Sequence, residues 1–196
     1  MIWIVGAGIC RGQMTERGKE LLRNADIVYG SRRAFELIDF ELKDRKILNR
    51  FDNSVFEEIA REGKEKEIVV LSTGDPMVAG LGRKFREMGV KVEIEPGISS
   101  VQVALAKLKV DLSEVVVVDC HARDFDLSML EFLKYRHLLI LADRRFDLTK
   151  LGDRRVAVLE NLCMEGESVR EGFADSVEIK SDYAVIFVER DKEVVE

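Results

Sequence analysis

The stretch EIVVLSTGDPMVAGLG, residues 67–82, decides the fold class of this chain. It begins with an uninterrupted apolar run at residues 68–71, which is typical of a strand covered on both faces. A loop with one proline and three glycines follows the run, and the amphipathic segment 80–88 comes next. A strand, a loop and a helix in that order form the repeating unit of an α/β fold with a largely parallel sheet.

The same alternation continues along the whole chain. Further apolar runs predict strands at residues 2–5, 26–29, 90–94, 115–118, 138–141, 156–159 and 184–188. Amphipathic segments predict helices at residues 15–25, 53–65 and 99–108. The polar stretch KVDLSE, residues 109–114, is the best candidate for a linker. We therefore expect two α/β domains with mostly parallel sheets, residues 1–110 and 111–196.

Composition excludes several classes of protein. The 196 residues carry 31 Lys and Arg against 37 Asp and Glu, a net charge of −6, and no basic run of five, so nucleic acid is not an expected partner. No apolar run approaches the roughly 18 residues of a membrane span, so no membrane partner is expected. Cys10, Cys120 and Cys163 cannot form a complete disulfide framework, and they lack the paired spacing of a zinc site. We expect no metal and a cytoplasmic location.

The only two prolines lie in loops that follow apolar runs. Pro76 belongs to the loop STGDPMVAGLG, residues 72–82, and Pro96 belongs to EPGISS, residues 95–100. Loops at the carboxyl ends of parallel strands are where α/β sheets bind ligands. Gly74 lets the backbone approach a ligand closely. Alternatively, the glycine and proline of either loop alone only mark an ordinary turn and have no role in ligand binding.

A third loop, GAGICRG at residues 6–12, follows the first apolar run. It is not a dinucleotide-binding fingerprint, because Arg11 stands where the third glycine is required and Asp26 begins the next strand instead of ending it. The loop therefore gives no support to a pyrophosphate site. A glycine turn that lets the backbone approach another ligand stays open.

Together, these three loops resemble a known family. The GAGIC turn, the GDP loop and the PGISS turn occur in the order and spacing of the tetrapyrrole methylases, which transfer methyl groups from S-adenosylmethionine (SAM) in cobalamin and sirohaem synthesis. The chain resembles the cobalt-precorrin-7 C(5)-methyltransferase branch, also called precorrin-6Y methylase, in YGSRRAFEL (29–37), VVVVDCHAR (115–123) and VLENLCMEGESVREG (158–172). It departs from the family pattern at Ile9, Cys10 and Arg11, and from the branch pattern at Ala122, where glycine is usual.

The resemblance implies a SAM site in a cleft between the two α/β domains. The contact residues that it implies are Ile9, Gly74, Asp75, Val78, Ser100, Val101, Ala142 and Leu162. Asp75 can supply an anionic hydrogen-bond acceptor. As alternatives, Asp75 stabilises the turn at Pro76 through its own carboxylate, and Ser99 or Ser100 caps the helix that follows.

The tetrapyrrole substrate of this family is a polycarboxylate, and the planar fork of arginine matches a carboxylate. The candidates for substrate binding are Arg11, Arg32, Arg33 and Arg123, with Arg144 and Arg145 as a further cluster. Alternatively, each of these arginines is an ordinary solvent-exposed surface residue that does not bind substrate. We prefer Arg33 and Arg123, and we expect alanine at either position to raise the substrate KM more than it weakens SAM binding.

His121 is the candidate base for a proton lost during methylation, because imidazole titrates near neutrality. A structural histidine at a strand end is the alternative. No covalent nucleophile is expected, because holding two reactants in line supplies much of the rate enhancement.

The sequence therefore predicts a SAM-dependent methyltransferase acting on carbon 5 of cobalt-precorrin-7 or precorrin-6Y in cobalamin biosynthesis. The alternatives are another member of the family, acting at a different macrocycle position or as a diphthine synthase, and a non-catalytic SAM or nucleotide sensor. The resemblance also implies a homodimer. Because no second methyltransferase domain follows in this sequence, we expect a separate C(15)-methyltransferase/decarboxylase as functional partner.

Overall fold

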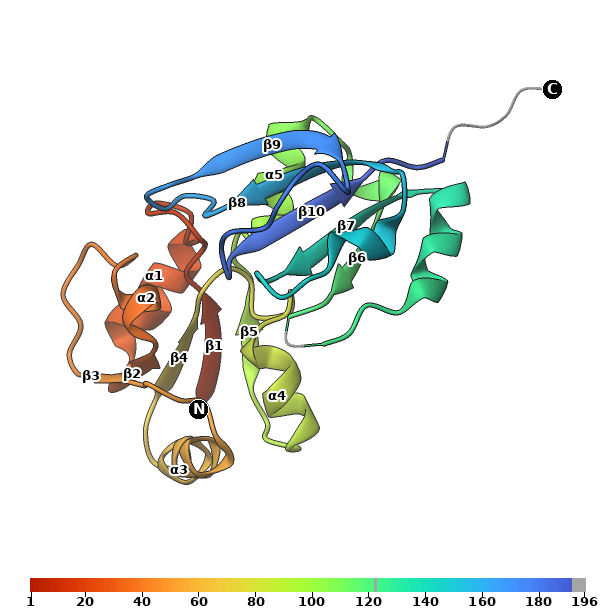
Figure 1. The fold of residues 1–196 in the computed structure, drawn as a ribbon. Coiled ribbons are helices and arrows are strands. Elements are labelled where there is room, and N and C mark those ends of the chain that lie inside the picture. Colours follow the sequence, from red (N-terminus) through yellow and green to blue (C-terminus); the bar gives the residue numbers. More distant parts are fainter. Residues whose placement is uncertain (122, 192–196) are drawn as a thin grey trace. The chain divides into compact units, whose positions relative to one another are not determined.

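The computed structural model describes residues 1–121 and 123–191, which fall into two compact units, Met1–Ser99 and Ser100–Glu196. Each unit contains one β-sheet (Figure 1). The sequence placed the boundary at residue 110, whereas the structure places helix α5 (Ser100–Leu108) in the second unit. The reason is that α5 contacts strand β10 (Ala184–Val188) of that unit.

The sheet of the first unit is parallel throughout. Its strand order is β3-β2-β4-β1-β5, and all four neighbouring pairs are parallel. The strands are β1 (Ile2–Gly6), β2 (Ile27–Gly30), β3 (Arg45–Ile47), β4 (Ile68–Ser72) and β5 (Glu93–Glu95). The helices are α1 (Glu16–Asn24), α2 (Arg32–Phe35), α3 (Asn53–Glu62) and α4 (Leu81–Glu87). The carboxyl ends of all five strands therefore lie at one edge of the sheet.

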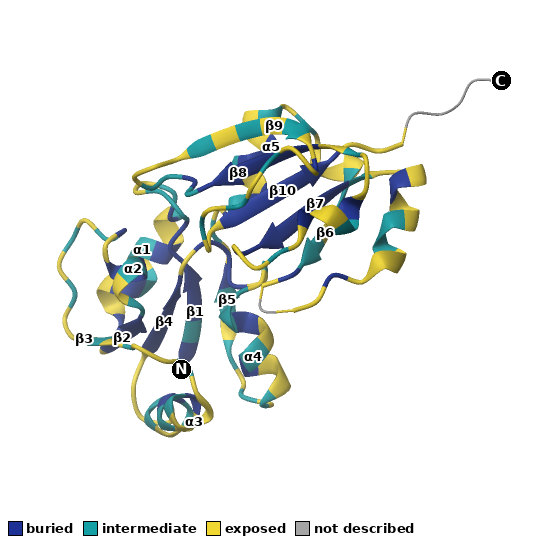
Figure 2. Ribbon diagram, viewed as in Figure 1, coloured by how far each residue is buried: buried dark blue, intermediate teal, exposed yellow. Residues whose placement is uncertain are grey.

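Helices cover both faces of this first sheet, which is why its central strands read as uninterrupted apolar runs. In β4, Val69 joins a buried cluster with Leu22 of α1. The next residue, Val70, joins a second buried cluster with Phe56 of α3 and Phe85 of α4. Figure 2 shows β1 and β4 as buried along nearly their whole length. The apolar run that decided the fold class is thus the centre of a two-sided core.

The sheet of the second unit is mixed. Its strand order is β6-β7-β10-β8-β9, in which β6 and β7 are parallel and the other three pairs are antiparallel. The strands besides β10 are β6 (Val115–Asp119), β7 (His137–Ala142), β8 (Arg155–Glu160) and β9 (Ser168–Phe173). The unit also contains three 3-10 helices: η1 (Leu112–Glu114), η2 (Leu127–Lys134) and η3 (Leu148–Leu151). The α/β class is confirmed, with one parallel and one mixed sheet.

Besides the three 3-10 helices, three elements of the described residues were not predicted from the sequence: α2, β3 and β9. Strand β3 has only three residues, two of them basic, so it carries no apolar signal. Strand β9 alternates half-buried and exposed residues around Arg170, and its strand character comes from pairing with β8. Helix α2 has four residues and begins after Ser31, whose side chain caps it.

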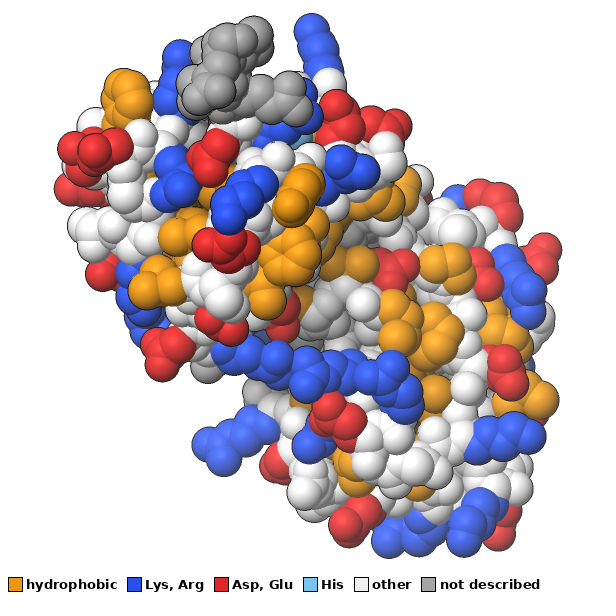
Figure 3. All heavy atoms as spheres, turned by 90° about the vertical axis from the view of Figure 1, so that its right-hand side faces the viewer, with side chains coloured by type: hydrophobic (Ala, Val, Ile, Leu, Met, Phe, Trp, Pro, Cys, Tyr) orange, Lys and Arg blue, Asp and Glu red, His pale blue; other side chains and the backbone are white. Residues whose placement is uncertain are grey.

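The surface carries both signs of charge in close alternation. Figure 3 shows Lys and Arg side chains interspersed with Asp and Glu side chains. Several charged side chains pair with a neighbour on their own helix. Lys19 lies 2.6 Å from Glu16 on α1, and Arg83 lies 2.7 Å from Glu87 on α4. Such exposed pairs contribute little each to stability. In the part of the chain that the structure describes, no helix combines the length and the apolar character needed to cross a membrane.

Candidate functional site

Three loops meet at the carboxyl edge of the first sheet: those that follow β1, β4 and β5. The Ala7 N–H donates to the Ser72 carbonyl at 2.8 Å, and Gly8 and Gly74 exchange two backbone hydrogen bonds of 3.3 and 2.8 Å. A Cβ atom on Gly97 would lie only 2.5 Å from the Gly74 carbonyl oxygen. Glycine is therefore required there by close backbone packing. The three motifs that the sequence singled out form one backbone cluster.

Asp75 joins two of these loops. Its carboxylate accepts the Met77 N–H at 2.7 Å and the Gly97 N–H at 3.1 Å, and the residue is only 9% exposed. The bond to Met77 is the turn-stabilising bond expected as an alternative role. The bond to Gly97 links the GDP loop to the PGISS turn and was not foreseen. Each carboxylate oxygen has a second lone pair, so a ligand contact by Asp75 stays a prediction.

Two side chains hold the turn that follows β1. Gln13 Oε1 accepts the N–H groups of Ile9 and Cys10, both at 3.0 Å. Arg33 Nη2 donates to the Ile9 carbonyl at 3.1 Å. The Ile9 N–H and C=O groups are thus both fixed by side chains. Gln13 was not predicted from the sequence, because a single amide after a glycine turn has no distinctive spacing.

The four arginines expected to bind substrate differ in their surroundings. Arg33 anchors the Ile9 carbonyl, and Arg11 Nε donates to the Glu36 carbonyl at 3.0 Å. Within residues 1–121 and 123–191, neither Arg32 nor Arg123 has an ion pair or a hydrogen bond through its side chain, and both are exposed. Arg32 and Arg123 are therefore the two whose guanidinium groups are available to a carboxylate.

A buried carboxylate ties the end of β5 to the start of α1. Glu95 accepts the Thr15 hydroxyl at 2.6 Å and lies 3.4 Å from Arg17 Nε. The Thr15 hydroxyl oxygen also accepts the Gly18 N–H at 2.9 Å, so one side chain caps α1 and binds Glu95. Sequence reasoning missed this contact because Thr15 and Glu95 are 80 residues apart.

Apolar side chains are exposed on the same three loops. Met77 is 51% exposed and Ile98 is 40% exposed, while Ile9 and Val78 are half-buried. A carboxylate with spare lone pairs and several apolar side chains thus lie at one sheet edge. This set of groups fits an adenosyl group with an attached cationic sulfur, which needs acceptors and an apolar wall.

The second sheet presents a corresponding edge. Strands β6, β7 and β8 all run in one direction, because β7 and β8 are each antiparallel to β10. Their last residues are Asp119, Ala142 and Glu160. Ala142 is fully buried, and Leu162 is buried in the turn that follows β8. The structure therefore brings Ala142 and Leu162 to one edge of the second unit.

The expected SAM contacts fall into two groups by unit. Ile9, Gly74, Asp75 and Val78 lie on the loops of the first sheet edge. Ser100 and Val101 begin α5, where Val101 is buried and Ser100 is half-buried. These two residues, with Ala142 and Leu162, belong to the second unit. The role of each residue toward SAM stays a prediction.

His121 follows β6 and contacts the last residue of that strand. Its Nδ1 atom lies 3.2 Å from Asp119 Oδ1, and its backbone N–H donates to the same oxygen at 3.2 Å. The side chain of His121 is 42% exposed. The ring is thus oriented by a carboxylate and open to solvent on its other side.

The arginines that follow β7 are already paired inside the second unit. Arg144 donates to the Asp182 carboxylate through Nε at 2.6 Å and Nη2 at 2.8 Å. Arg145 Nε donates to the buried Asp143 carboxylate at 3.1 Å. Both guanidinium groups are neutralised by aspartate, so this cluster is less suited to a substrate carboxylate than the sequence suggested. The partner of Arg144 is 38 residues away and carries no local signal.

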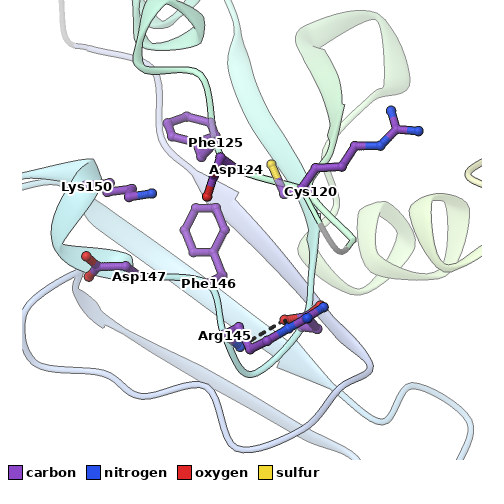
Figure 4. A pocket seen from close by; sticks show the side chains of 9 residues that line it. Cys120, Asp124, Phe125, Arg145, Phe146, Asp147 and Lys150 are labelled. Carbon is purple, nitrogen blue, oxygen red and sulfur yellow. Dashed lines mark hydrogen bonds and ion pairs between the residues drawn. The ribbon is translucent and has the colours of Figure 1, made fainter.

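A cavity of about 220 Å³ lies beside the loops after β6 and β7 (Figure 4). Its lining residues are Cys120, Arg123, Asp124, Phe125, Asp143, Arg145, Phe146, Asp147 and Lys150. Phe125 and Phe146 pack edge to face with centroids 5.6 Å apart. The pKa of the Cys120 thiol is raised to about 11, mainly because the thiol is buried and also because the Asp119 carboxylate is negatively charged. Cys120 is therefore a protonated thiol at neutral pH and a poor nucleophile.

Comparison with known proteins connects these loops to a family. The family model described as Tetrapyrrole (Corrin/Porphyrin) Methylases matches residues 1–178. The chain belongs to this family. It is accordingly a SAM-dependent methyltransferase, and the loops after β1, β4 and β5 are the part of this methylase that the sequence resemblance relied on.

Individual relatives of this methylase narrow the comparison. A solved structure of the cobalamin biosynthesis precorrin-6Y methylase from Archaeoglobus fulgidus is 60% identical, with a TM-score of 0.87, over 98% of this chain and 99% of that one. A probable cobalt-precorrin-7 C(5)-methyltransferase from Methanocaldococcus jannaschii is 34% identical over 86% of this chain and 87% of the relative. A precorrin-6Y C(5,15)-methyltransferase (decarboxylating) from a Sinorhizobium species is 30% identical over 85% of this chain but only 44% of the relative.

Proposed function

We propose that this methylase transfers a methyl group to carbon 5 of cobalt-precorrin-7, or of precorrin-6Y, in cobalamin biosynthesis. The observation that carries the proposal is the 60% identity with the Archaeoglobus precorrin-6Y methylase along nearly the full length of both chains. The name of the Methanocaldococcus relative specifies the same carbon. The segments at residues 29–37, 115–123 and 158–172 support the same branch of the family.

We propose that the loops of the first sheet edge hold SAM. The residues that we assign to it there are Ile9, Gly74, Asp75 and Val78, with Ser100, Val101, Ala142 and Leu162 as further contacts. SAM supplies a methyl group on a cationic sulfur that a carbon nucleophile can attack directly. The protein therefore has to bind, orient and exclude water, and this can supply about 7–11 kcal/mol without a covalent intermediate.

For the substrate carboxylates we propose Arg32 and Arg123. Both are exposed, and neither has a side-chain partner among the residues that the structure describes. Arg11 and Arg33 also follow strands of the first unit, but each already donates to a backbone carbonyl. Their role in the site is therefore to position loops, with any substrate contact secondary to that.

The decisive experiment is a transfer assay with SAM that carries a 13C-labelled methyl group and with the isolated tetrapyrrole. We expect one new methyl resonance, correlated by NMR with carbon 5. A methyl group on another carbon would refute the assignment of carbon 5, whereas the methyltransferase activity itself would stand. SAM binding with no transfer to any precorrin would instead favour a sensor. A matched control is Glu171→Gln, an exposed change on β9 that should transfer at the wild-type rate.

Three finer proposals accompany this function. We propose a homodimer in the cytoplasm, and light scattering should give about twice the chain mass of 22.3 kDa; a mass of one chain would refute the dimer.

We also propose that a separate protein carries the C(15) methylation and decarboxylation. The Sinorhizobium relative, whose name combines both carbons, is matched over only 44% of its length. The NMR assay above would contradict this separation if carbon 15 were also methylated.

A further inference from the structure

The pair formed by Asp119 and His121 has the geometry of a carboxylate that orients an imidazole. Asp119 Oδ1 lies 3.2 Å from both the Nδ1 atom and the backbone nitrogen of His121. An ionised carboxylate only accepts hydrogen bonds, so the Nδ1 atom facing it carries the hydrogen. The neutral ring then has its acceptor lone pair on Nε2, which is the nitrogen directed away from Asp119.

His121 faces a hollow of the second unit instead of packing into its core. The hollow, of about 520 Å³, is lined by His121 together with Asp143, Arg144, Arg145 and Asp182. The four charged residues form two ion pairs, so each cation that faces the imidazole is matched by a carboxylate. Asp119 is in direct contact with the ring, at 3.2 Å from Nδ1. The charges that line this hollow besides His121 therefore sum to zero.

Methyl transfer to a carbon that bears hydrogen releases one proton per turnover. The carbon supplies the electron pair of the new C–CH3 bond, and the pair of the broken S–CH3 bond stays on sulfur, which becomes a neutral thioether. The carbon must then lose its hydrogen as a proton, and the C–H electron pair returns to the conjugated macrocycle. A base with an exposed lone pair completes this balance.

We propose that His121 Nε2 accepts this proton, and that Asp119 is a positioning residue that fixes the tautomer in which Nε2 is free to do so. The inference rests on the proposed function, because it takes its proton from the methylated carbon. Proton transfer by a placed side chain typically contributes about 10²–10⁴-fold to rate.

The tautomer can be measured without any substrate, because the chain contains only two histidines. His137 provides the internal reference: its Nδ1 accepts the Arg190 N–H at 3.0 Å, so its hydrogen lies on Nε2. Burial lowers the pKa of His137, which keeps that ring neutral near pH 7. Nitrogen-15 NMR should therefore show opposite tautomers in the two rings above neutral pH. Nε2–H at His121 would overturn the proposal.

Kinetics test whether Asp119 acts through His121. We expect H121Q to lower kcat by about 10²-fold and D119A by about tenfold or more, with SAM affinity unchanged in both. The double variant D119A/H121Q should be no slower than H121Q alone, because a positioning residue has nothing left to position. A merely structural carboxylate would add its own loss in the double variant.

The variant D119N separates charge from shape, because its amide oxygen can still accept both bonds. The kcat of D119N should therefore lie between those of the wild type and D119A, because the amide oxygen still favours the hydrogen on Nδ1 while the charge is gone. The matched control is D126A, which removes the same kind of turn bond at a turn where the donor is a serine: the Ser128 N–H donates to Asp126 Oδ1 at 2.9 Å. It should leave kcat unchanged.

The outcomes distinguish this inference from the function on which it rests. A wild-type protein that methylates carbon 5 while D119A and H121Q keep full kcat would refute the proton-accepting pair and keep the function. A wild-type protein that methylates no precorrin would refute the function and with it the inferred reaction. Additive losses in the double variant would reduce Asp119 to a structural role.

Discussion

The two sheet edges of this methylase are built by different means. At the first edge, backbone meets backbone: Gly6, Gly74 and Gly97 approach so closely that added Cβ atoms on Gly6 and Gly97 would lie 2.5 Å from main-chain atoms. At the second edge, side chains make the contacts, as in the carboxylate of Glu160 and the ion pairs that follow β7. The first edge therefore leaves no room for an added Cβ at Gly6 or Gly97, whereas the second depends on particular charges.

The difference also determines what each edge can offer a ligand. The first edge presents backbone N–H and C=O groups held in fixed positions, which suits a donor that must be held in line. An edge made of side chains presents charges and titratable groups such as His121 and Arg123. We expect substitutions at the first edge to act mainly on SAM binding and those at the second to act on substrate binding and proton transfer.

The largest effect should come from Gly97→Ala. Its new Cβ would lie 2.5 Å from the Gly74 carbonyl oxygen and 2.8 Å from two Gly6 atoms, all of them backbone that cannot swing away. Overpacking of this kind should lower the free energy of unfolding by about 3 kcal/mol. SAM affinity should be lost at the same time. Denaturant titration and calorimetry measure the two effects.

The control for Gly97→Ala is Gly89→Ala, which lies in the turn after α4. Gly89 has a φ of +67° and no atom within 4 Å of an added Cβ, so the change introduces backbone strain alone, about 1–2 kcal/mol. SAM affinity should not change in this control. Normal SAM affinity in folded Gly97→Ala would break the comparison, because it would mean that the tight backbone contact is irrelevant to the ligand.

The sequence predicted the first edge better than the second for a physical reason. Glycine and proline restrict or free the backbone locally, so Gly74, Pro76 and Gly97 carry their structural meaning within a few residues. Contacts between distant side chains carry no such local mark. Arg144 and Asp182 pair across 38 residues, and no spacing rule connects them.

The same reason explains why the roles of some residues could not be predicted from the sequence. Arg33 looked like a substrate arginine because it follows a strand, but the carbonyl that it binds lies 24 residues earlier. Asp75 was expected both as a ligand acceptor and as a turn residue, and only its contacts in the folded chain reveal the link to Gly97. Strand β9 has too few apolar residues to be read without its partner β8.

An intermediate effect should come from Glu160→Gln at the second edge. The buried Glu160 carboxylate accepts the Lys180 N–H at 2.6 Å and the Ser181 N–H at 2.7 Å, and it pairs with Arg170. Burial alone would raise the pKa of Glu160, but these hydrogen bonds outweigh burial and the pKa lies below its usual 4.5. Loss of the charge should lower the free energy of unfolding by about 2 kcal/mol at pH 7.

The pH dependence of that loss follows from the direction of the shift. A carboxylate with a lowered pKa in the folded state stabilises the protein fully above about pH 4.5, and this contribution is lost as pH falls through the folded value. The gap between wild type and Glu160→Gln should therefore close below pH 4.5. The control Glu171→Gln, exposed on β9, should show no gap at any pH. A gap that is constant with pH would mean that shape, not charge, makes this contact.

The smallest effect separates two arginines that the sequence treated alike. Arg33 fixes the Ile9 carbonyl at 3.1 Å at the first edge, whereas the exposed Arg123 has no side-chain partner in the described ranges 1–121 and 123–191. R33A should therefore weaken SAM binding by about tenfold, the equivalent of a charged hydrogen bond of about 1.4 kcal/mol. R123A should leave SAM affinity unchanged and raise the KM of the tetrapyrrole.

The neighbouring Arg32 supplies the control for charge alone, because R32A removes a cation of α2 without touching Ile9. SAM affinity should survive R32A and fall in R33A, and R33K should restore it in part if its amine reaches the carbonyl. The opposite result, an R33A protein with normal SAM affinity and a raised substrate KM, would return Arg33 to the substrate. It would also show that the turn after β1 keeps its shape without Arg33, while Gln13 still accepts the Ile9 and Cys10 N–H groups.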